Sequence, residues 1–345
     1  MRPHVSLRSA VTRPTPLRLG LIGCGEVARR FHLPALARLT DRLEVTALAD
    51  VDEERCRSLA DRFRVPGRHA SAHSLIASDV EAIAVCVPSA DHARVASEVL
   101  RARKHLFLEK PIALSLADAD RLLGQLPRAS VVAMTGFNLR WHRLAQAARD
   151  LVRSGRLGRI RATRGVFSTG ERPSPGNWRE SATQGGHVLL DLGVHHFDLL
   201  RFLTGAEVEK VSARSSDPRR AEVSCALSDG TPAEIALSAA PGSNVSNAIE
   251  IEGERGDITL SFYPALGWRG PRRRGMLLFA GMVADRWQGG AYPSSYRRQW
   301  QGFADACRSG AGSPGATLAD GRAALAAALL ALESAGASTQ REGAR

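Results

Sequence analysis

The sequence predicts an α/β protein: a doubly wound parallel sheet comes first, and an α+β domain with a largely antiparallel sheet follows. Up to residue 137, short apolar runs alternate with segments of helical periodicity, as parallel strands and their crossover helices do. From residue 206 to 260, short alternating strands are broken by turn sequences such as SDGT and PGSN, which is typical of antiparallel sheets. At 345 residues, the chain also exceeds the length at which a single core usually stops growing.

In the first half, apolar runs predict strands and amphipathic segments predict the helices between them. Strands are expected at residues 17–23, 43–49, 82–87, 106–108 and 131–137. Helices are expected at residues 27–39, 51–63, 71–78, 91–103 and 115–126. This regular alternation predicts parallel strands with helices on both faces of the sheet.

The second half of the chain follows a different sequence pattern. A strand is expected at residues 159–168, a loop rich in Pro, Gly and Ser at 171–184, and a long helix at 187–203 that Gly205 ends. Two further helices are expected at 296–308 and 318–334, whereas residues 261–291 fit no pattern. We therefore divide the chain into a disordered extension (1–16), a first domain (17–137), a second domain (138–335) and a frayed tail (336–345).

The composition restricts the partners and the cellular compartment. The net charge of +12 is compatible with nucleic-acid binding, but the arginines are spread along the chain and aromatic residues make up only 5%. No run approaches the length of a membrane span, and residues 1–16 lack the apolar core of a secretory signal, although an organelle-targeting segment stays open. Five scattered cysteines without a C-x-x-C pair suit a reducing cytoplasm and argue against a disulfide framework or structural zinc. We expect a cytoplasmic protein without nucleic-acid or membrane partners.

A glycine-rich turn follows the first predicted strand, where Gly23, Gly25 and Ala28 form a G-x-G-x-x-A pattern. Gly23 permits the tight turn, Gly25 lets the backbone approach a pyrophosphate, and Ala28 allows the helix to pack closely on the strand. Asp50, at the end of the second strand, would bind the adenosine ribose and repel a 2'-phosphate. This favours NAD as the cofactor, although Arg55 could accommodate the phosphate of NADP. The pattern predicts a dinucleotide site, with a purely structural turn as the alternative.

Four more residues belong to the predicted cofactor site. They are Glu26 and Val27 inside the turn, and Pro88 and His92 after the strand at 82–87. The loop that carries Pro88 and His92 would border the cofactor, because it follows a neighbouring strand at the same edge of the sheet. A lone histidine such as His92 is more often a helix-start or packing residue than a ligand.

Lys110 differs from the other basic residues. The 47 basic side chains include only three lysines, Lys104, Lys110 and Lys210. An arginine keeps its proton in a protein, whereas burial or a nearby positive charge can turn a lysine into a working acid or base. Lys110 follows the apolar run 106–108, where a buried parallel strand delivers polar groups to the ligand-binding edge. We interpret it as an acid–base or substrate-binding group; a surface lysine is the alternative.

Asp191 and His195 are four residues apart on the predicted helix 187–203 and therefore share a face. A carboxylate one turn from an imidazole can orient it and favour its charged form. In isolation such a pair is more often a satisfied core or surface contact. His195, His196 and Asp198 could also be offered as metal ligands, but adjacent histidines point about 100° apart on a helix, so no metal site is expected.

Taken together, these motifs resemble the glucose-fructose oxidoreductase / inositol dehydrogenase / rhizopine catabolism (Gfo/Idh/MocA) family. The motifs are the turn at residues 23–28, the tripeptide Glu109-Lys110-Pro111, the loop Asn177-Trp178-Arg179 and the helix from Gly185-Gly186 through Asp191, Gly193 and His195 to Asp198. The resemblance covers about residues 17–334. It implies a doubly wound parallel Rossmann sheet followed by an α+β domain with a largely antiparallel, open-faced sheet. In such a protein the last helix packs back on the cofactor half, and the open face makes dimer or tetramer contacts.

The resemblance also implies residue roles. Lys110 would contact the reacting hydroxyl and the nicotinamide end of the cofactor, and Glu109 would lie near the nicotinamide ribose. Asp191 and His195 would be the dyad that moves the proton. We expect a loop with Trp178 and Arg179 to line the sugar pocket, although Trp178 could equally be a packing anchor.

We therefore expect reversible hydride transfer between NAD, or NADP, and a secondary hydroxyl or keto carbon of a sugar, an inositol or a nucleotide-linked sugar. The expected assembly is a homodimer or homotetramer. Two alternatives stay open. One is redox-neutral cleavage of glycosides, in which a transient oxidation drives elimination; the other is a non-catalytic nucleotide-sensing protein on the same fold.

Overall fold

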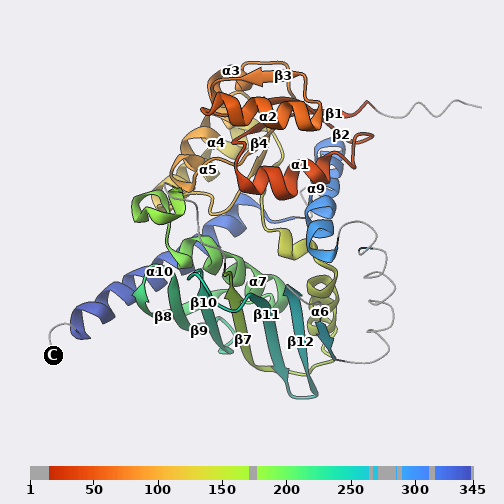
Figure 1. The fold of residues 1–345 in the computed structure, drawn as a ribbon. Coiled ribbons are helices and arrows are strands. Elements are labelled where there is room, and N and C mark those ends of the chain that lie inside the picture. Colours follow the sequence, from red (N-terminus) through yellow and green to blue (C-terminus); the bar gives the residue numbers. More distant parts are fainter. Residues whose placement is uncertain are drawn as a thin grey trace, which may run out of the picture.

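Two β-sheets, one in each half of the chain, form the framework of the fold (Figure 1). The computed structural model describes residues 15–170, 177–263, 267–270, 285, 290–310 and 315–342. The predicted extension at 1–16 lies mostly outside these residues, as do parts of the 171–184 loop and of the 261–291 segment. None of the described helices is long and apolar enough to cross a bilayer.

The first sheet is parallel throughout and confirms the predicted doubly wound fold. Its strands are β1 (Leu17–Ile22), β2 (Leu43–Ala49), β3 (Gly67–His69), β4 (Ala82–Val85), β5 (His105–Leu108) and β6 (Ala133–Thr135). They pair in the order β3-β2-β1-β4-β5-β6, so the strand order reverses between β1 and β4. Ligands of such sheets bind at the carboxyl ends of the strands beside this reversal. The sequence does not predict β3, because three residues without an apolar run carry no recognisable pattern.

Helices pack against this sheet, as buried parallel strands require. They are α1 (Leu33–Leu36), α2 (Glu53–Phe63), α3 (Ala72–Ile76), α4 (His92–Arg101) and α5 (Leu116–Ala129). The helix predicted at 27–39 is different in the structure, where a π-helical turn, η1 (Ala28–His32), precedes the four-residue α1. Pro34 has no N–H to donate to the preceding turn, and this is a physical reason for the widened spacing.

The second sheet is largely antiparallel, as predicted. Its strands are β7 (Ile160–Ser168), β8 (Val208–Asp217), β9 (Arg220–Leu227), β10 (Pro232–Ser238), β11 (Ser246–Gly253), β12 (Gly256–Tyr263) and β13 (Gly267–Arg269). They pair in the order β13-β12-β11-β7-β10-β9-β8. Only the pairing of β7 with β10 is parallel among the described strands of this sheet.

One face of the second sheet is covered by helices, and no described helix covers the other. The covering helices α6 (Arg143–Arg153), α7 (Val194–Thr204) and α10 (Leu318–Glu342) lie between this sheet and the first half of the chain (Figure 1). Along β10, Ala233, Ile235 and Leu237 are buried, whereas Glu234 and Ala236 between them are exposed. This alternation is the open-faced arrangement that the resemblance implies.

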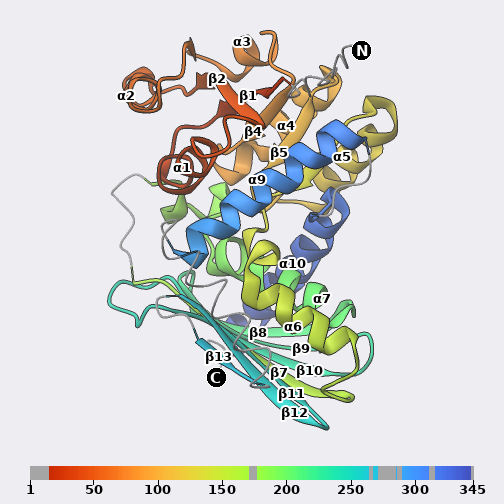
Figure 2. The same ribbon diagram turned by 90° about the vertical axis from the view of Figure 1, so that its right-hand side faces the viewer.

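The helix α9 (Ala291–Ser309) comes from the second half of the chain but completes the core of the first half (Figure 2). Trp300 and Phe303 on this helix are fully buried, and the ring of Trp300 stacks on Phe107 of β5 with centroids 4.2 Å apart. Burying such a ring contributes about 1.5–3 kcal/mol. The boundary drawn at residues 137 and 138 therefore does not separate two independent cores.

The last helix, α10, packs back against the first half, as the resemblance implies. The hydroxyl of Thr135, at the end of β6, donates to the carbonyl of Thr317 at 2.9 Å. Gly321 lies so close to Ile112 that a Cβ there would come within 2.5 Å of the isoleucine side chain. The helix continues to residue 342, so the tail expected to fray at 336–345 is helical for most of its length. Its alanine-rich sequence without proline favours this extension.

Candidate active site and cofactor crevice

The glycine turn lies after β1, where the strand order of the first sheet reverses. Gly23 has a φ of 98°, and a Cβ on it would lie 2.4 Å from the carbonyl oxygen of Cys86, so only glycine fits. A Cβ on Gly25 would meet nothing within 4 Å, which leaves open space above the turn. Ala28, the first residue of η1, is fully buried against the sheet. The turn therefore presents an accessible backbone surface of the kind that binds a pyrophosphate.

Glu26 and Val27 form the rim of this turn. Glu26 is exposed, and each of its carboxylate oxygens accepts a hydrogen bond of 2.9 Å from Arg29. These bonds lower the pKa of Glu26, and the positive charge of Arg179 acts in the same direction.

Asp50 lies where the sequence predicts the ribose-binding acid. One carboxylate oxygen accepts the backbone N–H of Cys24 at 2.6 Å, and the other accepts the N–H of Asp52 at 2.9 Å. The carboxylate thus ties the glycine turn to the end of β2, and it keeps lone pairs for a ribose. The guanidinium of Arg55 is 3.8 Å from Asp50, close enough to a 2'-phosphate position for NADP to stay open as a cofactor.

Val51 is a candidate cofactor residue that the sequence analysis missed. Its side chain is 91% exposed although it directly follows Asp50. The sequence places Val51 in a helix, but α2 begins at Glu53 because the Asp52 carboxylate caps it by accepting the N–H of Arg55 at 3.0 Å. An exposed apolar residue beside the ribose acid offers a surface for the adenine ring. The signal in the sequence was a valine next to a strong N-cap residue.

Lys110 is largely, but not fully, buried at the carboxyl end of β5. Its ammonium donates to the Asp191 side chain at 2.7 Å and to the Asp191 carbonyl at 2.8 Å, and only 12% of the lysine side chain is exposed. The alternative of a surface lysine is therefore wrong. The pair joins the first half of the chain to the helical segment of the second half.

Glu109, the neighbour of Lys110, is also buried. Its Oε1 lies 3.0 Å from Nε2 of His32, and its Oε2 accepts the backbone N–H of Lys110 at 3.1 Å. His32 ends the π-helical turn η1 that starts at the glycine turn. The sequence analysis did not select His32, and only its place near a predicted cofactor turn could have suggested it.

His92 does not direct a free nitrogen into the crevice. Its Nδ1 lies 2.6 Å from the carbonyl of Pro111, and its Nε2 lies 2.8 Å from the carbonyl of Val87. Both ring nitrogens thus have partners, so the geometry supports the packing interpretation of His92. Pro88 lies on the same loop, directly before the 3-10 turn η2 (Ser89–Asp91), and its predicted contact stays a prediction.

Asp191 lies between two cations. It belongs to a π-helical turn, η6 (Leu189–Gly193), that precedes α7 in place of the single helix predicted at 187–203. Besides Lys110, Arg179 donates to the Asp191 carboxylate at 2.8 Å, and the Arg179 guanidinium lies 4.5 Å from the ring centre of Trp178. Burial alone would raise the pKa of Asp191, but the charges of Arg179 and Lys110 hold it well below its usual range. Arg179 therefore contacts the site directly at the Asp191 carboxylate, and Trp178 lies beside it by packing on Arg179.

His195 is buried beside this cluster, between the rings of Phe137 and Phe167 at 6.0 and 5.8 Å. Its Nδ1 has no hydrogen-bond partner among the described residues. Burial, followed by the charge of Lys110, holds the pKa of His195 well below its ordinary value. The carboxylate of Asp191 favours the charged imidazole, but burial and the nearby lysine outweigh it, so the ring stays neutral.

Two residues of the rejected metal interpretation, His196 and Asp198, have other partners in the structure. The ring of His196 turns toward the second sheet, where its Nε2 lies 3.2 Å from the Oδ1 of Asn247. Asp198 pairs with Arg140 instead. No group of three or more His, Cys, Asp and Glu side chains in the described part of the chain could hold a metal ion.

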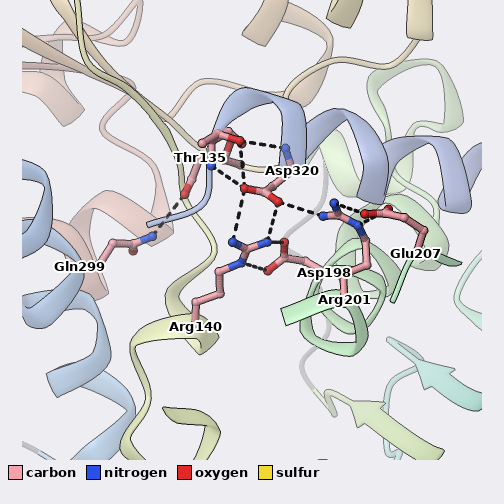
Figure 3. Close-up of polar contacts among 8 residues, drawn as sticks. Thr135, Arg140, Asp198, Arg201, Glu207, Gln299 and Asp320 are labelled. Atoms are coloured by element: carbon pink, nitrogen blue, oxygen red, sulfur yellow. Dashed lines mark hydrogen bonds and ion pairs between the residues drawn. The ribbon is translucent and has the colours of Figure 1, made fainter. Parts of the chain in front are cut away.

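A buried ion-pair network holds the helix α7 in place (Figure 3). Arg140, in the 3-10 turn η3 (Asn138–Trp141) after β6, donates to both oxygens of Asp198 at 2.6 and 2.8 Å. Asp320 of α10 lies 3.0 Å from both Arg140 and Arg201. Burial raises the pKa of Asp198 to about 6 despite Arg140. The network ties the helix that carries His195 to the first half of the chain and to α10.

The residues around the glycine turn suit a dinucleotide. The open space at Gly25, the carboxylate of Asp50 and the exposed Val51 supply a phosphate surface, a ribose acceptor and an apolar wall. Beyond them, Glu109 and Lys110 follow the carboxyl end of β5, Asp191 of η6 pairs with Lys110, and α7 carries His195. These features define a dinucleotide-binding protein with acid–base groups beside the cofactor.

Comparison with known proteins identifies the family. Residues 17–137 match the family described as "Oxidoreductase family, NAD-binding Rossmann fold", and residues 145–259 match the "GFO/IDH/MocA C-terminal domain". The chain belongs to the Gfo/Idh/MocA family of oxidoreductases, as the resemblance predicts.

Among curated relatives, the myo-inositol 2-dehydrogenase of Thermotoga maritima is 32% identical over 201 residues, which is 58% of each chain. The dTDP-3,4-didehydro-2,6-dideoxy-alpha-D-glucose 3-reductase of Streptomyces violaceoruber is 34% identical over 192 residues, or 56% of each chain. The match thus spans less than two thirds of these relatives.

Solved structures match over nearly the whole chain. A probable dehydrogenase from Thermotoga maritima is 26% identical with a TM-score of 0.77, covering 93% of this chain and 97% of that one. The WlbA dehydrogenase of Bordetella pertussis, in complex with NADH and UDP-GlcNAcA, is 21% identical with a TM-score of 0.81, covering 94% and 96%. At 21% identity, the similarity to the WlbA dehydrogenase shows only that the two chains share a fold.

Proposed function

We propose that this protein is an NAD-dependent oxidoreductase that transfers a hydride between the nicotinamide and a secondary hydroxyl or keto carbon of a sugar, an inositol or a nucleotide-linked sugar. The observation that carries the proposal is the buried ion pair between Lys110 and Asp191, with His195 beside it, at the carboxyl end of β5. The family and the names of its dehydrogenase and reductase relatives support the same chemistry. Asp50 favours NAD over NADP.

The bound cofactor supplies or accepts the hydride at its nicotinamide ring. In the oxidation direction, His195 takes the proton of the substrate hydroxyl, because burial keeps its imidazole unprotonated and therefore able to accept one. Lys110 donates a hydrogen bond to the same oxygen and positions it. Asp191 offsets the charge of Lys110 in the buried site, and Arg179 fixes the other carboxylate oxygen.

The Trp178–Arg179 segment lines the substrate side of the site in this proposal, since Arg179 contacts Asp191 directly. The assembly is a homodimer or homotetramer that pairs through the open face of the second sheet. The compartment is the cytoplasm, which suits five cysteines that are all free in the structure.

The test is the near-ultraviolet absorbance of reduced nicotinamide, with NAD or NADP supplied against a panel of inositols, aldoses and nucleotide sugars. Lys110→Met should lower turnover by about a hundredfold or more while cofactor binding persists. Lys210→Met, at an exposed position on β8, is the matched control and should be unchanged. Undiminished turnover in Lys110→Met would remove the role given to this lysine. Product without reduced cofactor would point to redox-neutral elimination instead.

A further inference from the structure

His32 connects three parts of the molecule. Its ring is fully buried at the end of η1, where it contacts Phe107 of β5 and Tyr296 and Trp300 of α9 edge-on, with ring centres 5.3–5.6 Å apart. One ring nitrogen faces the indole N–H of Trp300 at 3.2 Å, and the other faces Glu109 at 3.0 Å. The glycine-turn segment, the segment that carries Lys110 and the helix α9 therefore meet at one imidazole.

These contacts select one tautomer of His32. The indole N–H of Trp300 can only donate, so Nδ1 of His32 must accept. The proton of the neutral ring then lies on Nε2 and is donated to Oε1 of Glu109. A proton on Nδ1 would set two donors against each other. Trp300 thus directs the histidine's N–H toward Glu109.

The Glu109 carboxylate has little room to move and few hydrogen-bond donors around it. A Cβ on Gly136 would approach its Oε1 to 2.6 Å, so the backbone packs directly against the carboxylate. Among the described residues, the carboxylate receives hydrogen bonds from His32 and from the backbone N–H of Lys110. The hydrogen bond from the backbone N–H of Lys110 fixes the backbone of this lysine, whose ammonium contacts Asp191.

Titratable groups face Glu109 from every element packed around it. They are Lys110 on its own segment, Cys86 after β4, His92 on α4, His32 on η1, and Tyr292 and Tyr296 on α9. Burial raises the pKa of the thiol and of both phenols and lowers the pKa of His92, so these groups stay neutral. Burial would also raise the pKa of Glu109, but the hydrogen bond from His32, together with the charge of Lys110, holds it below its ordinary value.

We propose that His32 is a positioning residue of the active site, which keeps Glu109 ionised and oriented beside Lys110 and whose tautomer is selected by Trp300. The proposal rests on the function proposed above and on the place near the nicotinamide ribose that the family resemblance implies for Glu109. Without the His32 donor, Glu109 takes up a proton at a higher pH, and the variant loses activity on the acidic side.

Two amide variants distinguish the roles of the two ring nitrogens of His32. The amide of His32→Gln reaches the position of Nε2 and can still donate to Glu109, whereas the shorter amide of His32→Asn reaches only the position of Nδ1. Trp300→Phe keeps the aromatic stack on Phe107 but removes the indole donor. The readouts are kcat/KM relative to the unaltered protein and NADH affinity by fluorescence, each from about pH 6 to about pH 9.

The relative kcat/KM of His32→Asn should fall about tenfold for each pH unit below the raised pKa and recover toward pH 9, while His32→Gln stays nearly level. NADH affinity should follow the same trend, and Trp300→Phe should lie between the two. A loss that is equal at every pH, or no difference between the Gln and Asn variants, would overturn the positioning role. If the unaltered protein turns over no substrate, the proposed function fails, whereas the pH dependence of NADH binding still decides the role of His32.

Discussion

Removing Arg140 should destabilise the protein strongly, and by an amount that depends on pH. Only 11% of the arginine side chain is exposed, and it binds both oxygens of Asp198, whose side chain is 2% exposed (Figure 3). Arg140→Met keeps the apolar stem but leaves the Asp198 carboxylate buried without its cation. Breaking a buried ion pair from one side costs about 3–5 kcal/mol, so we expect a loss of this size near pH 8.

The pH dependence follows from Asp198. Burial already raises its pKa to about 6 in the unaltered protein, against an ordinary value of 3.8, and removal of Arg140 raises it further. A carboxyl group with a raised native pKa binds its proton more tightly in the folded state, so the free energy of unfolding falls as pH rises through the window between the two values. The penalty of Arg140→Met should therefore be smallest near pH 5, where Asp198 is protonated in both folded proteins, and should grow as pH rises above about 6.

Urea unfolding followed by circular dichroism measures this penalty at about pH 5 and at about pH 8. Arg94→Met is the matched control, because Arg94 pairs with Asp91 at 2.9 Å but is 61% exposed, and an exposed pair contributes about 0–1 kcal/mol. Adding Asp198→Asn to Arg140→Met should restore most of the loss, since the buried charge is then gone. The reasoning is refuted if Arg140→Met costs no more than the control, or if its penalty is the same at both pH values.

Two further changes test the cofactor crevice. Gly25→Ala should fold normally, because a Cβ there meets nothing within 4 Å, yet it should weaken NADH binding about tenfold or more by blocking the approach of the pyrophosphate. The control Gly124→Ala, which has equally open space, should bind NADH as the unaltered protein does. Normal NADH binding by Gly25→Ala would argue against the phosphate site. Asp50→Ser should shift the ratio of NADP to NAD affinity upward by about tenfold or more, because the repelling carboxylate is removed beside Arg55. Asp52→Ser is its control, and an unchanged ratio would show that Asp50 does not select the cofactor.

Much of the first half could be predicted because its signals are local. Apolar runs of strand length, helical periodicity between them and a glycine whose φ must be positive each depend on neighbouring residues only. The same holds for the helix end at Gly205, which adopts a φ of 80°. Where a local signal was absent or misread, the prediction failed: β3 is too short to show a period, and Pro34 interrupts a helix that periodicity alone extends across it.

The side-chain chemistry of the site was predicted less well, because it depends on groups that are distant in the chain. Asp191 and His195 share a helical segment, and their spacing alone predicts a coupled pair. The structure instead brings Lys110, 81 residues away, to the carboxylate, and burial then decides the charge of the histidine. Spacing along one helix reports which groups are neighbours, but it does not report which competing partner arrives from another element.

By itself, the sequence determined the doubly wound sheet, the glycine turn with its acid, the largely antiparallel second sheet and the family, since these follow from periodicity and from residues at fixed local offsets. The tertiary structure decided which side chains meet: Arg179 with Asp191, and Trp300 with His32 across 268 residues. It also decided that Val51 is exposed and that His92 is enclosed. The physical reason is that burial and long-range hydrogen bonds belong to the packed assembly of elements, and no window of sequence contains them.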